Sequence, residues 1–283
     1  MDEFADIRPY NDTEFPHILE RLLVEPDLVK GLAYFMRPSW RGPLRLLARS
    51  LVRWRLQRDL SKLESIEQFQ QWLAGYVQQI IAKTTTGLIV EGLDGLASAS
   101  SHVWLSNHRD IVLDTSLLNM TLIDHKLITT ASAIGDNLVQ KDFLMELSKL
   151  NRNFLVLRDQ SPRELLMSSK LLSNYIKFLL QSNRSVWVAQ REGRTKDGLD
   201  KTQQGVLKMI TMARGKTPLM TYLRELSVIG VAISYEYDPT DILKVPEIVA
   251  KRENLPYIKT ANEDFNSILK GALGNKRNIH IAA

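Results

Sequence analysis

The chain contains no cysteine and little proline or glycine. Its 283 residues include 10 prolines and 14 glycines, and 44% of them are hydrophobic. The absence of cysteine excludes disulfide bridges, thiolate metal ligands and cysteine nucleophiles. The low proline and glycine content and the ordinary apolar content indicate a folded protein of one large or two small domains.

Long apolar runs are also absent. No run approaches the roughly 20 residues that a helix needs to cross a bilayer. Residues 1–6 are acidic and lack the apolar core of a signal peptide. We therefore expect a cytoplasmic protein that does not cross a membrane, although it is able to lie on the inner face of one.

Several cofactor and catalytic motifs are missing. Gly193 and Gly198 have the spacing of a phosphate-binding loop, but Lys201 and Thr202 follow two residues too late. The chain has no Gly-x-Gly-x-x-Gly dinucleotide motif and no Gly-x-Ser-x-Gly elbow. Its five histidines lack metal-ligand spacing. The sequence therefore predicts no bound cofactor and no metal.

Positive charge is concentrated in one segment. Residues 37–58 carry seven arginines and no acid, so this window is +7 while the whole chain is +5. Arg45, Arg49 and Arg53 recur every four residues beside a leucine and tryptophan stripe, a pattern typical of a helix in a lipid headgroup layer. A surface helix with a solvated basic face is the equal alternative. Nucleic acid is disfavoured as a partner, because the only aromatic residues in the window are Trp40 and Trp54.

The hydrophobic pattern changes near residue 85. Residues 1–84 are predicted to form an N-terminal helical region, which lies at a membrane surface in the lipid-binding interpretation of its basic helix. Residues 85–283 alternate short β-branched runs with amphipathic helices, which predicts an α/β domain with a mostly parallel sheet flanked by helices. The expected strands are residues 88–91, 103–106, 127–131, 154–158, 185–190, 228–234 and 278–283, and the expected helices are 112–122, 137–150, 163–182 and 202–214. In such folds chemistry lies where strands end and helices begin.

The first polar strand end contains a histidine and two nearby acids. The apolar run 103–105 leads to His108, Asp110 and Asp114. A histidine there is able to face a cleft, and an aspartate one turn away is able to fix its tautomer, leaving the other nitrogen free as a base. The alternative is that Asp110 is a helix N-cap and His108 a surface loop residue.

Two further strands end in residues suited to anions. Phe154–Leu157 is followed by Arg158, and the strand ending near Gln190 opens into a loop with Glu192, Gly193, Arg194, Thr195 and Lys196. Arginine clamps anions, and a flexible glycine lets backbone approach a phosphate. Each motif alone is also compatible with a solvated turn.

Taken in order, these strand ends resemble the first three blocks of the glycerolipid acyltransferase family, which includes glycerol-3-phosphate and 1-acylglycerol-3-phosphate acyltransferases. The resemblance covers residues 87–235, and the run 228–234 falls where the family has its fourth, apolar block. Two departures stand out. The family's aspartate position is Leu113 here, with aspartates at 110 and 114, and the third block has its arginine one place early, at Arg194.

The resemblance implies transfer of a fatty acyl group from acyl-CoA or acyl carrier protein to a hydroxyl of a glycerol-phosphate-type lipid such as lysophosphatidate, in phospholipid synthesis. It assigns His108 as general base and Asp114 as its partner, with Asp110 as helix cap and fallback. It implies that Arg158, Arg194 and Lys196 bind the acceptor phosphate, in a pocket shaped by Glu192, Gly193 and Thr195. The alternatives are an acyltransferase acting on a lyso-aminolipid, and an inactive lipid-surface protein of the same fold.

Overall fold

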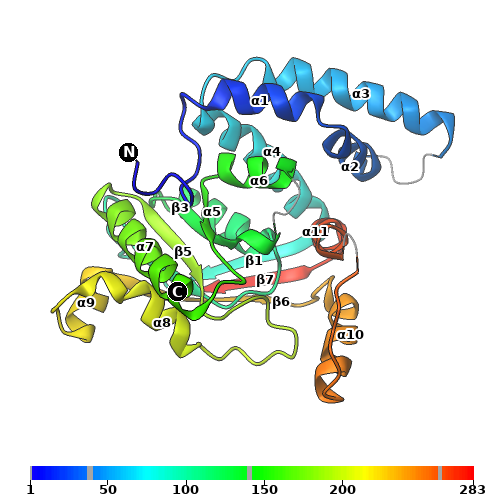
Figure 1. The fold of residues 1–283 in the computed structure, drawn as a ribbon. Helices are drawn as coiled ribbons and strands as arrows, with labels where there is room; N and C mark the ends of the chain where they lie inside the picture. The colour runs from blue at the N-terminus through cyan, green and yellow to red at the C-terminus, as the bar shows by residue number, and fades with distance from the viewer. Residues whose placement is uncertain (1, 37–40, 139–141, 261–262) are drawn as a thin grey trace.

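The computed structural model describes residues 2–36, 41–138, 142–260 and 263–283. They form an α/β fold in which one seven-stranded, mostly parallel sheet is flanked by helices, with a helical region at the N-terminus (Figure 1). The predicted fold class is confirmed. In the described ranges, no helix combines the length and apolarity needed to span a bilayer.

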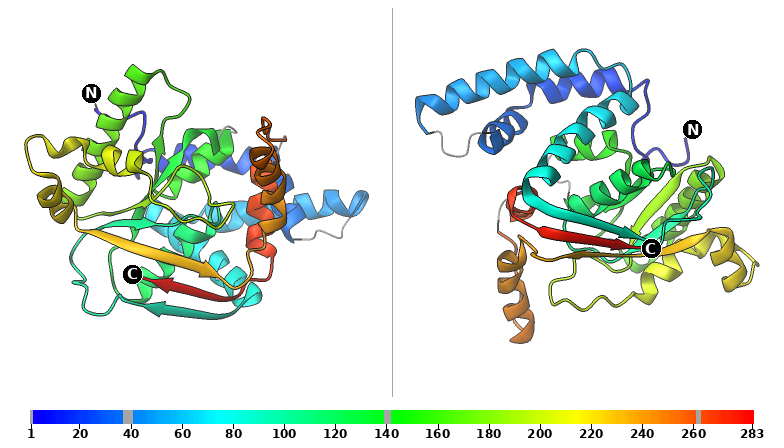
Figure 2. Two further views of the ribbon diagram at one scale, coloured as in Figure 1. Left: turned by 90° about the horizontal axis from the view of Figure 1, so that it is seen from below. Right: turned by 180° about the vertical axis from the view of Figure 1, so that it is seen from behind.

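The sheet has the strand order β1-β7-β6-β2-β5-β3-β4. All neighbouring strands are parallel except β6 and β7, which are antiparallel. Figure 2 shows β6, β7 and β1 side by side at one edge of the sheet. The strands are β1 (Thr85–Glu91), β2 (Val103–Ser106), β3 (Thr130–Gly135), β4 (Asn153–Val156), β5 (Ser185–Ala189), β6 (Val228–Tyr235) and β7 (Arg277–Ala282).

Helices precede the sheet and connect its strands. The N-terminal helices are α1 (Phe15–Val24), α2 (Pro26–Met36), α3 (Pro43–Leu60) and α4 (Ile66–Thr84). The later helices are α5 (Leu113–Asp124), α6 (Asp142–Leu150), α7 (Pro162–Gln181), α8 (Gln204–Ile210), α9 (Leu219–Glu225), α10 (Asp241–Arg252) and α11 (Glu263–Leu273), with short 3-10 turns at Asp136–Leu138 and Met212–Arg214.

The central strands are buried on both faces, because side chains alternate sides along a strand. Val103, Val186 and Val188 pack with α7 and α8 on one face. Trp104 and Trp187 pack with α4 and α5 on the other face. These strands therefore consist of continuous apolar runs, as expected for a sheet covered on both sides.

The N-terminal helices have a core of their own. Phe15 and Phe69 are fully buried there, with ring centroids 6.2 Å apart. Phe143 and Leu150 of α6 belong to the same cluster, so α6 joins the N-terminal helices to the sheet.

The predicted elements match most of the observed ones. The start signal Ser161-Pro162 opens α7, where Ser161 and Glu164 form a reciprocal capping box. The expected helix 137–150 begins only at Asp142, after a 3-10 turn, and residues 139–141 lie outside the described residues. Helices α9, α10 and α11 have no counterpart among the predicted elements.

The prediction of a strand over residues 127–131 was wrong in its bounds, because β3 starts three residues later and ends four residues later, at Thr130–Gly135. Lys126 has φ 58°, and the backbone N–H of Leu127 donates to the carbonyl of Leu122 at 2.8 Å. This is the bond that closes a helix C-terminus in a Schellman motif. Leu127 therefore packs with Leu122 as part of the helix end, and β3 begins at Thr130.

A lysine is completely buried between α11 and β7. The Lys276 ammonium donates to the Gly274 carbonyl at 2.8 Å, to Thr84 Oγ1 at 2.9 Å and to the Ala272 carbonyl at 3.1 Å. Burial lowers the pKa of Lys276 to about 8. The folded chain therefore releases this proton at a pH where the unfolded chain still holds it.

Because of Lys276, we expect the free energy of unfolding to rise at alkaline pH. Between about pH 8 and 10 the unfolded state binds more protons at this group, so its contribution to the unfolding free energy increases with pH and is lost as pH falls through 8. In urea titrations, wild type should therefore gain stability relative to Lys276→Met over this range. Parallel stability curves for the two proteins would contradict the assignment.

Candidate active site

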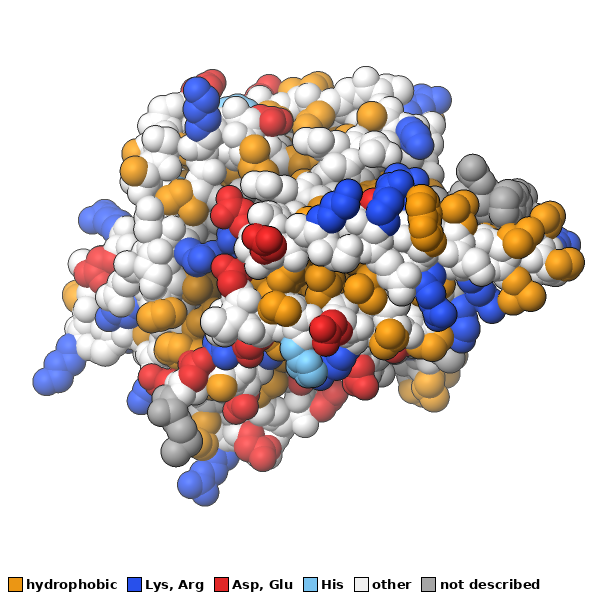
Figure 3. All heavy atoms as spheres, turned by 90° about the horizontal axis from the view of Figure 1, so that it is seen from above, with side chains coloured by type: hydrophobic (Ala, Val, Ile, Leu, Met, Phe, Trp, Pro, Cys, Tyr) orange, Lys and Arg blue, Asp and Glu red, His pale blue; other side chains and the backbone are white. Residues whose placement is uncertain are grey.

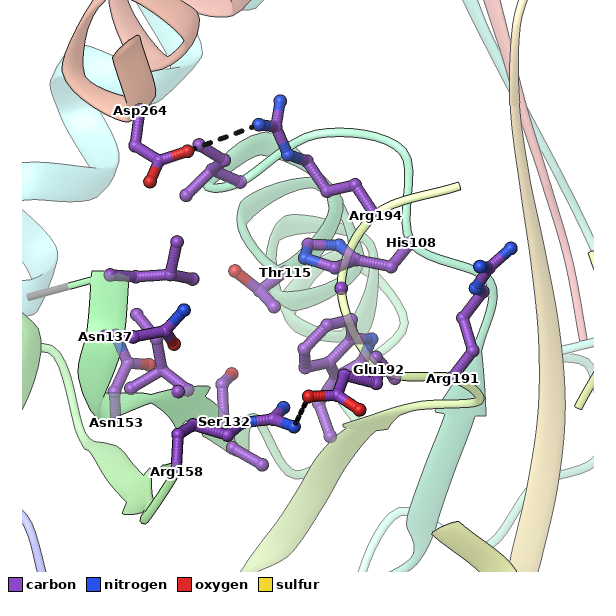
Figure 4. A pocket seen from close by; sticks show the side chains of 18 of the residues that line it. His108, Thr115, Ser132, Asn137, Asn153, Arg158, Arg191, Glu192, Arg194 and Asp264 are labelled. Atoms are coloured by element: carbon purple, nitrogen blue, oxygen red, sulfur yellow. Dashed lines mark hydrogen bonds and ion pairs between the residues drawn. The ribbon is translucent and has the colours of Figure 1, made fainter. Parts of the chain in front are cut away.

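A cavity of about 230 Å³ lies at the carboxyl ends of the central strands. His108 from the loop after β2, Ser132 from β3, Arg158 after β4 and Arg194 after β5 all line it (Figure 4). Parallel strands place the residues that follow them at one edge of a sheet, which explains why segments far apart in sequence meet here.

His108 is held by Asp114 in the first turn of α5. The Nδ1 atom of His108 lies 2.8 Å from Oδ2 of Asp114, and the Asp114 side chain is completely buried. The imidazole makes an edge contact with Trp187, with ring centroids 5.3 Å apart. Because Nδ1 is occupied, Nε2 is the nitrogen left to act in the cavity that His108 lines.

The Asp114 carboxylate accepts three more hydrogen bonds. Its Oδ2 receives the backbone N–H of Arg109 at 2.7 Å and that of Asp110 at 3.0 Å, and its Oδ1 receives the hydroxyl of Tyr235 at 2.7 Å. Two backbone donors on Oδ2 require the atom to be an acceptor, so His108 must carry its proton on Nδ1. In the neutral imidazole the lone pair is therefore on Nε2.

Tyr235 ends β6 and acts as a donor only. Burial and the neighbouring charge of Asp114 raise the pKa of Tyr235 far above its usual range. Its hydroxyl therefore keeps its proton and orients Asp114. The predicted strand 228–234 stopped one residue short of Tyr235, and a tyrosine closing an apolar strand was the signal that the sequence offered.

Among the described residues Asp110 forms no hydrogen bond with His108, and it binds the backbone before α5 instead. Its Oδ1 receives the backbone N–H groups of Val112 at 3.0 Å and Leu113 at 2.9 Å, although the N-cap residue of α5 is Val112 and not Asp110 as the sequence suggested. The helix begins at Leu113, one residue later than predicted, and Asp114 in its first turn reaches His108. Burial and the Asp114 charge raise the pKa of Asp110.

The position of the Asp110 side chain requires a glycine in α11. A Cβ added at Gly271 would lie 2.1 Å from Oδ2 of Asp110. The absence of a side chain at Gly271 therefore lets α11 approach the loop that carries His108.

The cations in the cavity are paired with acids. Arg158 donates to Glu192 at 2.5 Å, and Arg194 lies 3.5 Å from Asp264. Lys259 also contacts Asp264, at 2.9 Å. The pairs are partly exposed, so each contributes little to stability and an incoming anion is able to displace the acid.

The remaining predicted residues of the loop have different positions. Gly193 lines the cavity with φ 68°, which other residues adopt only with strain. Lys196 also lines it and pairs with Glu247 of α10. Thr195 does not line the cavity, because it is buried, its hydroxyl donates to Asp200 and its N–H donates to the His108 carbonyl.

A second, more apolar cavity of about 370 Å³ adjoins the first. Arg158 and Glu192 line both cavities and lie between them. The second cavity is lined mainly by aliphatic side chains, among them Leu155, Leu157, Leu172, Val188, Val206 and Met209.

The start of α11 and the segment before it contribute residues that no sequence pattern predicted. Lys259, before the helix, and Asp264, in its first turn, line the cavity, and only the folded chain brings them there. As for metals, no group of three His, Asp or Glu side chains that could hold an ion occurs among the residues that the structure describes.

Comparisons with known proteins give distant structural similarity only. No family model matches the chain, and no curated protein does. The 1-acyl-sn-glycerophosphate acyltransferase PlsC from Thermotoga maritima is similar with a TM-score of 0.38 and 15% identity, over 96% of this chain and 81% of that one. Chloroplast FtsY from Physcomitrella patens is similar with a TM-score of 0.26 and 13% identity, over 95% of this chain and 97% of that one.

The geometry predicts a weaker hydrogen bond to His108 in Asp114→Asn. Oδ2 of Asp114 faces both the two backbone N–H groups and Nδ1 of His108, so an asparagine whose oxygen stands there still accepts from all three and turns its NH₂ toward Tyr235. The tautomer is kept but the acceptor loses its charge, so the Nδ1 proton of His108 should resonate downfield in wild type and move upfield in the variant. Asp110→Asn serves as the control and should keep the wild-type proton shift, and an unchanged shift in Asp114→Asn would refute the arrangement.

Proposed function

We propose that the chain is an O-acyltransferase that moves a fatty acyl group from a thioester to a hydroxyl of a glycerol-phosphate-type lipid acceptor such as lysophosphatidate. The observation that carries the proposal is the His108–Asp114 pair facing a cavity whose walls hold Arg158, Arg194 and Lys259. A base beside a cationic wall suits an acceptor with both a hydroxyl and a phosphate.

The proposed chemistry uses the Nε2 lone pair of the neutral His108 imidazole. As the acceptor oxygen attacks the thioester carbonyl carbon, Nε2 takes the hydroxyl proton and the buried Asp114 carboxylate stabilises the resulting imidazolium. The C–S bond then breaks, the acyl ester forms, and the leaving thiolate takes the proton back from Nε2. No acyl-enzyme is needed, which is compatible with a chain that lacks cysteine.

The other residues bind and orient the substrates. Arg158 and Arg194, with Lys259, would hold the acceptor phosphate once it displaces Glu192 and Asp264. Lys196 would add positive charge at the same wall, and Gly193 would let the backbone approach. The second cavity would take the acyl chain, because it is lined mainly by aliphatic side chains and adjoins the first cavity at Arg158 and Glu192.

We further propose that the protein binds an anionic membrane surface through α3. Leu44, Leu47, Leu51 and Trp54 of this helix are exposed beside Arg45, Arg49 and Arg53. Figure 3 looks onto the N-terminal helices and shows hydrophobic and basic side chains together at the end formed by α2 and α3. Arg37 and Trp40 of the basic window lie outside the described residues.

Replacing His108 by alanine tests the catalytic proposal. Removal of a general base should lower acyl transfer from a labelled acyl thioester by about 10²–10⁴-fold. The exposed His17, on α1, offers His17→Ala as a matched control that should keep full activity. A folded His108→Ala protein with near-normal turnover would disprove the proposal and favour a non-catalytic lipid-binding role.

Substitution of three arginines tests the membrane proposal. Each arginine near an anionic bilayer contributes roughly 1 kcal/mol, so Arg45→Gln, Arg49→Gln and Arg53→Gln together should weaken vesicle binding about 100-fold. Co-sedimentation with phosphatidylserine-containing vesicles measures this, and binding should fall with salt. Glutamines at the exposed Lys170, Lys177 and Lys208 are the control, and equal binding by both triple variants would refute the assignment.

A further inference from the structure

A third cavity, of about 400 Å³, lies between α10 and the loop that follows β5. Arg191, Arg194 and Lys196 line both this cavity and the active-site cavity, so the two hollows adjoin. In Figure 1, α10 projects from the edge of the sheet. A ligand in the third cavity would therefore be partly open to solvent and still close to the candidate active site.

Positive charge dominates the third cavity. The loop contributes Arg191, Arg194 and Lys196, and the last turn of α10 contributes Lys251 and Arg252. Three carboxylates also line it, of which Glu247 pairs with Lys196 and Asp197 lies 3.9 Å from Arg191. The cations exceed the acids, so the cavity favours an anion.

Lys251 and Arg252 are the cations still available in this cavity. Within the described residues neither side chain forms an ion pair or a side-chain hydrogen bond, and both are exposed. Glu247 and Lys251 are four residues apart, as are Ile248 and Arg252, so one side of α10 carries all four against the loop.

We propose that this cavity binds the phosphate-bearing nucleotide end of coenzyme A, so that the acyl donor of the proposed reaction is acyl-CoA. The inference rests on the proposed function, since it assigns the donor of that reaction. A donor bound in this way has its phosphates on Lys251 and Arg252, its thioester near His108 and its acyl chain in the apolar cavity.

The shape and charge of the cavity favour a nucleotide over an acidic carrier protein. A carrier protein docks through an acidic surface, which needs a broad basic face rather than a hollow. Glu247 and Asp197 would repel such a surface, whereas a small polyanion is able to contact the cations individually. The planar guanidinium of Arg252 or Arg191 also suits stacking on an adenine ring.

The test measures binding of coenzyme A and of 3′,5′-ADP to the full chain by calorimetry. The double variant Lys251→Glu, Arg252→Glu should weaken both ligands at least about tenfold, which corresponds to about 1.4 kcal/mol. Glu247→Gln should tighten binding a few-fold, because it releases Lys196. Lys170→Glu with Lys177→Glu, on the exposed side of α7, is the matched control and should bind as wild type.

Kinetics separate the donor site from the acceptor site. The double variant should raise KM for acyl-CoA at least about tenfold while KM for the acceptor stays within twofold. A raised acceptor KM with an unchanged donor KM would overturn the inference. A defect seen only with acyl carrier protein as the donor would also overturn it. The same holds if the double variant binds coenzyme A with wild-type affinity.

The binding arm also separates this inference from the proposed function. A chain that binds coenzyme A in a manner dependent on Lys251 and Arg252, yet transfers no acyl group with any donor, contradicts the proposed function alone. A chain that transfers acyl groups while its coenzyme A affinity is unaffected by the double variant contradicts this inference alone. Circular dichroism of the double variant verifies that exposed positions on α10 have been changed without unfolding.

Discussion

The candidate site depends on one buried carboxylate. Asp114 accepts hydrogen bonds from His108, from two backbone N–H groups and from Tyr235, so its position and its acceptor role are both determined. A carboxylate without solvent is stable only when donors surround it. The same donors determine which imidazole nitrogen of His108 carries the proton, and therefore which nitrogen is able to act as a base.

Three other segments of the fold hold Asp114 and His108 in place. Asp110 accepts backbone N–H groups at the start of α5, Gly271 lets α11 approach, and Tyr235 reaches Asp114 from the end of β6. The sheet supplies rigidity, because its central strands are covered on both faces. The cations around the site form partly exposed ion pairs. These pairs are weaker than the buried hydrogen bonds of Asp114, so the cations are able to exchange an acid for a ligand.

Three adjoining cavities extend from the same edge of the sheet. One is lined by aliphatic side chains, one by His108 and paired cations, and one by cations of α10 and the loop after β5. Arg191 and Glu192 line all three cavities, which makes the loop after β5 the segment where the acyl chain, the reacting centre and the bound anion of the proposed reaction would meet.

The sequence by itself determined the α/β class, the helix start at Ser161 and the polar strand ends at His108, Arg158 and Glu192–Lys196, because periodicity and caps are local properties. It left Asp110 and Asp114 as alternatives, since both lie within six residues of His108 and only the folded chain shows which carboxylate reaches the imidazole. The tertiary structure alone placed Lys259, Asp264 and Lys251 near the site and withdrew Thr195 from the cavity. Contacts between distant segments depend on how the helices pack, and no local pattern encodes them.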